Sequence, residues 1–397
     1  MLIHSIKLKN FLSFGPQESE VKLQPLSVII GPNASGKSNF LEAFEFLRTV
    51  PSNLGSSIRS GGGIQDWLWK GPQSKSEENP VSTVEAIFES PKTDTKHLGR
   101  LCYKISFYSE QSRFRLLDEI LEAERPLISE KRPFSYYRYD NGNPVISEKK
   151  NLFSLVPELY DSNASILSQV AYPPQFPEFS YLAKNMSHIR LYKDWGLGFL
   201  SPIRNMQATD LPNQILQSDY GNLALVLNQI RMNQKAKQRF LEELQNFYEE
   251  VVDFDTFISG NTLQIVFLER GLESPVPATR LSDGVLRYLT LIAILCNPTL
   301  PPLICIDEPE LGLHPDAIPR IATLLQETSE KCQIIVTTHS QIFIESFDKN
   351  PEAVLVCEKS ENGTNLTRLD KVALEPWLRK YSLAELWARG DIGGNPW

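Results

Sequence analysis

One eight-residue segment constrains the fold of this chain more than any other. Residues Gly31–Ser38 read Gly-Pro-Asn-Ala-Ser-Gly-Lys-Ser and match the Gly-x-x-x-x-Gly-Lys-Ser pattern of a phosphate-binding loop. The apolar run Leu26–Ile30 precedes the loop. Apolar residues follow it at helical spacing: Phe40, Ala43, Phe44 and Leu47. The pattern predicts a strand, a phosphate loop and a helix in succession, which is the context that this motif requires.

The residues of the loop suit a nucleoside triphosphate. Gly31 and Gly36 allow tight turns, so that amide groups and the positive end of the helix converge on the β-phosphate. We expect Lys37 to reach the β- and γ-phosphate oxygens and the Ser38 hydroxyl to bind Mg²⁺. ATP and Mg²⁺ are therefore the predicted ligands. A Gly-rich turn that contains Lys-Ser by chance is disfavoured, because such a match is rare. The predicted binding residues are Gly31, Pro32, Asn33, Ala34, Ser35, Gly36, Lys37, Ser38 and Asn39.

Two adjacent carboxylates, Asp307 and Glu308, follow a second apolar run. Leu303–Ile306 comes after Pro301 and Pro302 and is fully apolar, as expected of a central strand buried on both faces. In open α/β sheets, ligands bind at the carboxyl ends of strands. We expect Asp307 to hold Mg²⁺ through water and Glu308 to orient or deprotonate the attacking water. Alone, such a pair is usually a solvated strand end, and the other motifs of the chain favour a catalytic pair.

Two further motifs complete a recognisable set. Leu281–Gly284 reads Leu-Ser-Asp-Gly before the apolar helical run Val285–Leu295, and His339 follows the strand-like run Gln333–Thr338. The chain thereby resembles ABC-type ATPases, which carry a phosphate loop, a signature, a Walker B strand with a catalytic Glu, a D-loop and a switch histidine in this order. The D-loop would be Leu311–Pro315. Five motifs in the right order are far more specific than any single one.

The resemblance is closest to the SMC, RecF and OLD branch of that superfamily. Heads of this branch begin with a strand pair like Ile3–Leu8 and a segment like Lys9–Phe14. The resemblance covers about residues 1–125 and 275–370. It implies an α/β fold: a P-loop NTPase head of the ABC/RecF-like kind, with a mixed central sheet, an antiparallel β subdomain and a compact helical insertion.

The predicted domains follow shifts in sequence pattern. Residues 1–125 are expected to form an N-terminal ATPase lobe with the phosphate loop and antiparallel strands. Residues 126–272 are expected to be an insertion, first irregular and then a helical lid. Residues 273–370 would form the C-terminal ATPase lobe with the signature, Walker B, D-loop and switch His, and 371–397 a C-terminal helical tail.

Three kinds of pattern support these boundaries. Period-two alternation predicts strands at Ser82–Phe88, Leu101–Tyr108 and Phe114–Leu121. Residues 126–180 are rich in Pro, Ser, Asn and Tyr, which suggests irregular structure, and the pattern turns helical from about Ser187 to Asp253. SMC proteins insert a long coiled coil at this place. Sustained heptads are missing here, so we expect a compact lid instead of an arm.

The resemblance also implies a site shared between two copies of the chain. Such heads are inactive alone and close face to face on two ATP molecules, which predicts an ATP-dependent homodimer. Ser282 and the Gly284 amide would touch the γ-phosphate held by Lys37 of the other subunit, with Ser282 capping the helix. Asp283 and Val285 depart from the commonest signature, Leu-Ser-Gly-Gly-Gln. The Asp283 carboxylate would repel the γ-phosphate unless it points away or meets a cation.

His339 has two interpretations. Its position after Thr337 and Thr338 favours contact between its side-chain N–H and the γ-phosphate, and a structural histidine at a strand end is the alternative. The predicted catalytic residues are Lys37, Asp307, Glu308 and His339, and the predicted metal ligands are Ser38 and Asp307. The glutamine that links Mg²⁺ to the insertion in these ATPases has no clear position, with Gln65 and Gln207 as candidates.

Charge and composition limit the partners. The net charge of −8 gives no overall basic surface for nucleic acid, so any DNA contact must be local. Arg59 resembles the arginine loop of SMC heads, although a Gly-rich surface loop is the favoured interpretation. Five cysteines in mostly apolar contexts indicate reduced core thiols of a cytoplasmic protein. The N-terminus lacks the pattern of a signal peptide and no apolar run could span a bilayer, so no membrane partner is expected.

Two functions remain open. In the first, the ATPase works as a nucleotide-gated dimer on double-stranded DNA, in DNA repair, DNA maintenance or anti-phage defence. In the second, a regulatory ATPase module controls a separate effector protein, such as a nuclease, without binding DNA. A transporter motor fits less well, because its phosphate loop and signature lie much closer together than Gly36 and Ser282.

The C-terminal tail bears on the choice. The segment after the last expected strand is too short for the TOPRIM nuclease domain of OLD proteins, so a nuclease would be another chain. An apolar helical stripe along Trp377–Trp387 either caps the core or meets a partner.

Overall fold

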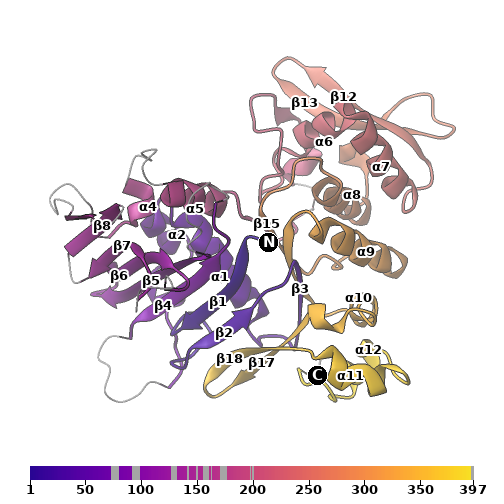
Figure 1. Ribbon diagram of the computed structural model, residues 1–397. Coiled ribbons are helices and arrows are strands. Elements are labelled where there is room, and N and C mark those ends of the chain that lie inside the picture. Colours follow the sequence, from indigo (N-terminus) through magenta and orange to yellow (C-terminus); the bar gives the residue numbers. More distant parts are fainter. Residues whose placement is uncertain are drawn as a thin grey trace. The chain divides into compact units, whose positions relative to one another are not determined.

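The computed structural model of this chain divides into two compact units (Figure 1). The first unit comprises Met1–Ile189, Glu352–Asp370 and Gly390–Trp397, and the second comprises Arg190–Pro351 and Lys371–Arg389. The structure describes all residues except 73–79, 92–98, 127–131, 141–142, 149–150, 155–160, 162, 170–176, 197, 199–200 and 395–397.

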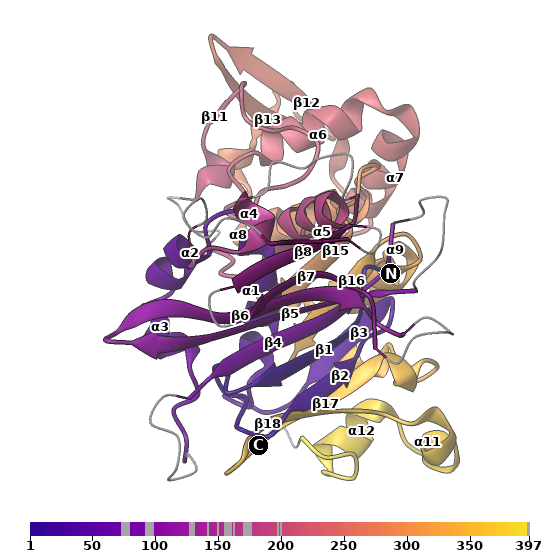
Figure 2. The ribbon, with the colours of Figure 1, turned by 60° about the vertical axis from the view of Figure 1, so that its left-hand side comes forward.

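The first unit contains an eight-stranded antiparallel sheet. Its strands lie in the order β2-β1-β4-β5-β6-β7-β8-β9 (Figure 2). Buried and partly exposed residues alternate along β4, because one of its faces packs on the core. The strands are β1 Ile3–Lys9, β2 Ser19–Lys22, β4 Ser82–Phe88, β5 Leu101–Glu110, β6 Arg113–Ala123, β7 Ser135–Asp140, β8 Asn143–Glu148 and β9 Asn151–Ser154.

This sheet confirms part of the expected pattern and differs from another part. The strands expected near residues 82, 101 and 114 are β4, β5 and β6. Strands β7, β8 and β9, by contrast, lie in the segment that we expected to be irregular, and so do helices α4 (Ile166–Gln169) and part of α5 (Pro177–Ser187). The Pro and Asn content of the segment concealed three tyrosines in β7, and aromatic residues favour strands. Other residues of this segment lie outside the described ones.

A second group of strands in the first unit carries the phosphate loop. Strand β3 (Leu26–Ile30) pairs in parallel with β17 (Val354–Ser360), which forms an antiparallel hairpin with β18 (Gly363–Arg368). All five residues of β3 are buried, as its continuous apolar run predicts. Helix α1 (Lys37–Thr49) begins directly after the loop. The expected succession of strand, loop and helix is present.

Helix α1 packs against the antiparallel sheet through aromatic side chains. Phe46 of α1 stacks on Phe107 of β5 with ring centroids 5.2 Å apart, and its ring lies 5.7 Å from that of Phe11. The other two phenylalanines of α1, Phe40 and Phe44, are fully buried. The start of α1 is therefore anchored from the buried face of the helix. Two short helices follow it, α2 (Leu54–Ser60) and α3 (Ile64–Trp67).

The second unit contains a parallel group of strands. They are β10 (Arg190–Tyr192), β15 (Leu303–Asp307) and β16 (Gln333–Thr338), in the order β10-β15-β16. All of β16 and the first four residues of β15 are buried. Because both strands run in the same direction, Asp307 and Thr338 lie at the same edge of this group.

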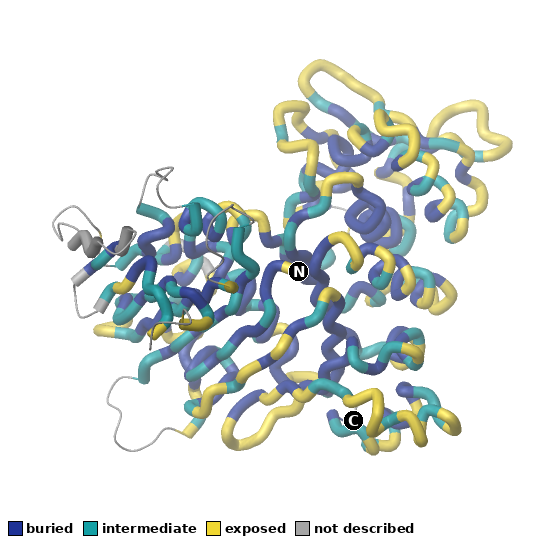
Figure 3. The backbone as a smooth tube through the Cα atoms, in the orientation of Figure 1, coloured by how far each residue is buried: buried dark blue, intermediate teal, exposed yellow. Residues whose placement is uncertain are grey.

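The second unit also contains residues 190–272, the later part of the segment that we expected to be an insertion. Helices α6 (Leu223–Met232) and α7 (Gln234–Gln245) pack on the hairpin of β12 (Val251–Ser259) and β13 (Thr262–Glu269). Two short strands, β11 (Gln207–Ala208) and β14 (Val276–Pro277), also pair with β13. We expected the helical pattern to continue to Asp253, but Val251–Ser259 forms strand β12, which pairs antiparallel with β13. The far end of β12 is exposed (Figure 3).

The remaining α-helices belong to the second unit. They are α8 Asp283–Leu295, α9 Ile318–Ser329, α10 Gln341–Glu345, α11 Lys371–Leu378 and α12 Leu383–Ala388, with 3-10 turns at Pro202–Arg204, Ala278–Arg280, Pro315–Ala317 and Pro351–Ala353. The apolar stripe along Trp377–Trp387 is buried in one part and exposed in another. Leu383, Leu386 and Trp387 of α12 are buried, whereas α11 has no buried residue and Trp377 is 51% exposed.

The cysteines agree with the expectation of core thiols. All five cysteines are buried and unbridged. Within the described part of the chain, none of the helices has the length and hydropathy that a membrane crossing requires.

Candidate nucleotide site

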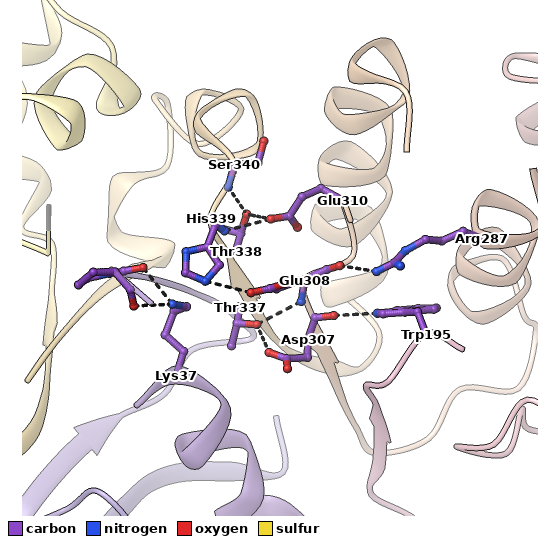
Figure 4. Close-up of polar contacts among 12 residues, drawn as sticks. Lys37, Trp195, Arg287, Asp307, Glu308, Glu310, Thr337, Thr338, His339 and Ser340 are labelled. Carbon is purple, nitrogen blue, oxygen red and sulfur yellow. Dashed lines mark hydrogen bonds and ion pairs between the residues drawn. The ribbon is translucent and has the colours of Figure 1, made fainter. Parts of the chain in front are cut away.

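The lysine of the phosphate loop is buried and bonds to carbonyl groups of the same loop. Lys37 is 5% exposed, and its Nζ donates to the carbonyl oxygens of Gly31 and Pro32, each 2.9 Å away (Figure 4). Gly36 has a φ of 111° and Ala34 a φ of 60°, both in the left-handed region. A non-glycine residue in that region is uncommon and marks a backbone shaped by its surroundings. The backbone of the loop is therefore curved at both positions.

The C-terminal hairpin β17–β18 braces this loop. Thr364 Oγ1 donates to the Ser35 carbonyl at 2.8 Å, and Cys357 Sγ contacts the same oxygen at 3.5 Å. A Cβ at Gly36 would lie 2.2 Å from Thr364 Oγ1, so the close approach requires glycine there. Sequence reasoning missed Thr364 and Cys357, because no local motif joins residues more than 300 positions apart.

The start of α1 has the features of an anion site. Gly36 occupies the N-cap, so in the described structure no side chain caps the first helical turn. The Ser35 hydroxyl is buried and has no hydrogen-bond partner among the described residues. Unpaired N–H groups at a helix N-terminus bind phosphate favourably. An orphaned hydroxyl beside them fits a bound phosphate group, which would supply the missing partner.

The predicted carboxylates gather at the edge of the parallel strands in the second unit. The Thr337 hydroxyl donates to Asp307 Oδ1, and the Glu308 amide donates to the Thr337 carbonyl at 3.1 Å (Figure 4). His339 Nε2 lies 2.9 Å from Glu308 Oε1, and both side chains are about a third exposed. The structure therefore brings Asp307, Glu308 and His339 together with access to solvent.

A third carboxylate, that of Glu310, bonds to the residues that precede and carry the His339 side chain. Its Oε1 accepts the Thr338 hydroxyl at 2.5 Å and the His339 amide at 3.0 Å. Burial raises the pKa of Glu310, and the two bonds oppose that rise. Glu310 thus fixes the backbone from which the His339 ring projects. The sequence contains Glu310 next to the paired carboxylates, but pattern alone gave it no role.

Two residues missed by sequence reasoning hold the backbone of the carboxylate pair. Trp195 Nε1 donates to the Asp307 carbonyl at 2.8 Å, and Arg287 Nη2 donates to the Glu308 carbonyl at 2.7 Å. Arg287 stands five positions after Ser282, and Trp195 lies just beyond β10, so neither belongs to one of the five ATPase motifs. In the sequence, the only hint of a role for Arg287 was a charged residue within the apolar run of α8.

The signature segment forms a capped helix start in the second unit. Ser282 is the N-cap of α8, and its hydroxyl accepts from the Val285 amide, as expected. Asp283 pairs with Arg204, whose guanidinium also donates to the Leu281 carbonyl at 2.7 Å. The carboxylate that departs from the common signature therefore meets a cation. A Cβ at Gly284 would lie 3.3 Å from the carbonyl oxygen of Gly312 in the expected D-loop.

The remaining candidates have local roles. Gln207 is buried, and its side-chain oxygen accepts from the Ala224 amide at 2.7 Å, so its amide is used within the insertion. Gln65 is exposed and donates to the Ser109 hydroxyl at 2.9 Å. Arg59 lies at the end of α2 and lines a cavity of about 690 Å³ together with Arg113 and Arg115. Arg59 is therefore in a helix, with the Gly-rich turn after it.

Comparison with known proteins then decides the family. A family model described as "AAA domain, putative AbiEii toxin, Type IV TA system" matches residues 26–345, which include the phosphate loop, the signature and the carboxylate pair. The chain belongs to this family. It is an ATPase of the SMC/RecF/OLD-like kind, as the order of its motifs implied. The roles of the individual site residues stay predictions.

Two curated relatives agree with this assignment. An ATP/GTP phosphatase of Helicobacter pylori is 23% identical over 362 residues, which cover 88% of this chain and 88% of that protein. An OLD nuclease of Thermus scotoductus is 22% identical over 361 residues, which cover 86% of this chain and 60% of that protein. The second relative is thus considerably longer than the matched part.

Solved SMC heads have the same fold. An Smc head bound to the C-winged helix domain of ScpA matches with a TM-score of 0.59 at 15% identity, over 94% of this chain and 99% of that one. An Smc head with an extended coiled coil, bound to the C-terminal domain of ScpA from Pyrococcus furiosus, matches with a TM-score of 0.54 at 14% identity, over 95% and 98%. The expected fold class, a P-loop NTPase head, is confirmed.

The donor set suits Mg²⁺ with ATP better than a metal alone. Within the described residues, no three His, Cys, Asp or Glu side chains gather to hold a metal ion. Mg²⁺ in nucleotide sites takes one or two protein oxygens and completes its octahedron with phosphate and water. The Ser38 hydroxyl in the first unit and the Asp307 carboxylate in the second are each an oxygen donor of that kind.

Proposed function

We propose that this ATPase works as an ATP-gated homodimer in which each nucleotide contacts both copies of the chain. Lys37 binds the β- and γ-phosphates of one ATP, and Ser38 and Asp307 hold its Mg²⁺. Ser282 and the Gly284 amide of the second copy contact the γ-phosphate. ATP thus joins the two copies, and loss of the γ-phosphate loosens them.

The state of the α8 N-terminus is the observation that supports this proposal most. Ser282 and Asp283 are exposed, although the rest of α8 from Leu286 to Leu295 is buried. The Ser282 hydroxyl caps the helix, and Arg204 balances the charge of Asp283. A capped and exposed helix start with its acidic residue neutralised suits contact with an anion brought by another molecule.

The carboxylate edge suits the chemical step. Glu308 Oε1 lies 2.9 Å from His339 Nε2, and the Glu308 side chain is 31% exposed. A carboxylate at the end of a strand, partly open to solvent, can accept a proton from an attacking water. His339, on the next strand, can donate from its ring to the γ-phosphate. Glu308 is therefore assigned as the base and His339 as the residue that senses the γ-phosphate.

The direct test uses Glu308→Gln, which keeps the size of the side chain but removes its basicity. This variant should form a stable dimer with ATP and Mg²⁺ and stay monomeric with ADP, as measured by light scattering after gel filtration. Wild-type protein should dimerise only transiently. A Glu308→Gln variant that binds ATP and remains monomeric at saturating nucleotide would contradict the proposal.

Double-stranded DNA is the partner that we favour for this dimer. Arg59, Arg113 and Arg115 line one cavity of the first unit together with Asp161, and Arg115 pairs with Glu110. Arginine side chains gathered in this way can hold phosphate groups despite the net negative charge of the chain. DNA should therefore stimulate turnover, and the stimulation should fall with added salt and with Arg59→Glu. If duplex DNA does not change the rate of ATP hydrolysis at any salt concentration, DNA is excluded as the partner.

Control of a separate effector is the second candidate. Helix α11 exposes Val372 and Trp377, and none of its residues is buried. A protein that copurifies with the full chain and is lost on deletion of Trp377–Trp397 would support this candidate. Trp377→Ala tests the same surface without shortening the chain. In that case DNA would have no effect on turnover.

A further inference from the structure

The backbone of Glu308 has a conformation that its own side chain does not favour. Its φ is 47°, in the left-handed region that non-glycine residues rarely adopt. Such a conformation persists only where surrounding bonds determine it. The Glu308 amide accordingly donates to both the carbonyl and the hydroxyl of Thr337, at 3.1 and 3.2 Å. The direction of the Glu308 carboxylate depends on the bonds that hold this residue.

The strongest of the bonds to the Glu308 carbonyl comes from helix α8. Arg287 Nη2 donates to this oxygen at 2.7 Å, and the Arg287 side chain is 5% exposed (Figure 4). Burial lowers the pKa of Arg287 to about 10, so the guanidinium remains protonated near neutral pH. A buried cation that donates to a carbonyl makes a charge-assisted hydrogen bond, which is about twice as strong as a neutral one.

Trp195 holds both Arg287 and the neighbouring carbonyl. The guanidinium carbon lies 4.4 Å from the ring centroid of Trp195, and Tyr220 stacks on Trp195 with centroids 5.3 Å apart and planes 17° apart. The same indole donates its N–H to the Asp307 carbonyl at 2.8 Å. One layered group therefore fixes two consecutive carbonyls, those of Asp307 and Glu308.

We propose that Arg287 and Trp195 are positioning residues for hydrolysis. They hold the strained backbone of Glu308 so that its carboxylate points at the attacking water, and Arg287 ties that backbone to the helix whose first residue follows Ser282. This role rests on the proposed function of Glu308. A purely structural role would instead lower the stability of the fold and leave the turnover of the folded enzyme unchanged.

Two conservative variants separate these roles. Arg287→Lys keeps a positive charge but cannot both stack on Trp195 and reach the Glu308 carbonyl in the same way. Trp195→Phe keeps an aromatic ring but lacks the N–H donor to Asp307. Arg239→Lys is the matched control, because Arg239 pairs with Glu327 on the surface of the same unit. We would measure kcat, the Kd for ATP and the thermal midpoint for each.

The expected result is a selective loss of turnover. Arg287→Lys should lower kcat about 10- to 100-fold and Trp195→Phe about 3- to 10-fold, in the range of a lost hydrogen bond in an organised active site. The Kd for ATP should change less than about twofold, because neither residue belongs to the phosphate loop. Arg239→Lys should behave like wild type. If Arg287→Lys proves insoluble, Trp195→Phe alone decides.

A double variant supplies a readout that stability does not affect. If Arg287 acts only through Glu308, Glu308→Gln/Arg287→Lys should turn over no more slowly than Glu308→Gln alone. Unchanged kcat in both single variants, or full additivity in the double variant, would overturn the positioning role while Glu308 keeps its own. A wild-type rate for Glu308→Gln would instead remove the proposed function itself.

Discussion

The phosphate loop and the carboxylate edge hold their functional groups by different means. In the loop, Lys37 bonds to the carbonyls of residues five and six positions away, and glycine at 36 permits the turn. At the carboxylate edge, the carbonyl of Asp307 is held by Trp195, 112 positions away, and that of Glu308 by Arg287. The lysine of the loop is thus held by carbonyls close to it in the sequence, whereas the carbonyls of the edge are held by side chains that only the fold brings near.

This difference predicts how each region responds to mutation. A change in the loop should act on nucleotide binding, because the loop presents donors to phosphate. A change at the carboxylate edge should act on the rate of hydrolysis with binding intact. Four variants separate the two regions.

Lys37→Ala should abolish the function of the loop. It removes the ammonium that would bind the β- and γ-phosphates and leaves the carbonyls of Gly31 and Pro32 without their donor. We expect the affinity for ATP to fall at least about 100-fold, which corresponds to about 3 kcal/mol of charge-assisted bonding. Isothermal titration with a non-hydrolysable ATP analogue measures this. Retained affinity would place the phosphates elsewhere.

Glu308→Gln should lower the rate of hydrolysis at the carboxylate edge and leave ATP binding by the phosphate loop unchanged. Turnover should fall by about 100- to 10,000-fold, because a neutral amide cannot accept the proton of water. The affinity for ATP should stay within about twofold of wild type. Single-turnover hydrolysis of labelled ATP measures the rate, and Glu327→Gln, on the surface of the second unit, is the control. A variant that loses binding and turnover together would remove the contrast between the two regions.

Ser282→Arg should leave the phosphate loop and the carboxylate edge of each copy unchanged and act on the contact between two copies. The long cation blocks close approach of a second copy to the α8 N-terminus, whose hydroxyl cap it also removes. ATP binding should be unchanged, dimerisation should be lost, and turnover should fall to the level of Glu308→Gln. Removal of the cap itself costs about 1 kcal/mol of stability, which thermal unfolding can separate from the effect on turnover.

Thr364→Val should give the smallest effect. It removes the hydroxyl that donates to the Ser35 carbonyl and leaves a buried acceptor with less support. The cost of one neutral hydrogen bond, about 1 kcal/mol, predicts an ATP affinity about two- to fivefold lower. Thr364→Ser keeps the hydroxyl and should restore binding. Equal affinity for all three proteins would show that the hairpin β17–β18 does not brace the loop.

Sequence alone could predict the parts of this molecule that depend on local pattern. The run before Gly31, the glycines of the loop and the Ser282 cap each rest on residues within one turn or strand, and the structure has them as expected. The order of the motifs sufficed for the fold class. The roles of the residues in hydrolysis stay predictions.

Contacts between distant residues could not be predicted in this way. Thr364 and Arg204 belong to no motif, and their function in the fold depends on which loops meet. Strand β12 was missed because its charged residues, Asp253 and Asp255, are offset by Lys237 and Arg231 on neighbouring helices. Such pairing makes an acidic strand acceptable, and a single sequence does not reveal it.

The most direct test of the shared site mixes two variants that should each be inactive. Lys37→Ala lacks a working loop, and Ser282→Arg lacks a working signature, so a dimer of one copy each contains one complete site between them. Neither variant should form a dimer with itself, so the dimers that form in the mixture should be mixed ones. The mixture should therefore regain up to about half of wild-type turnover, since each mixed dimer has one of two sites. A mixture that stays as inactive as its separate components, with both variants folded, would contradict the account.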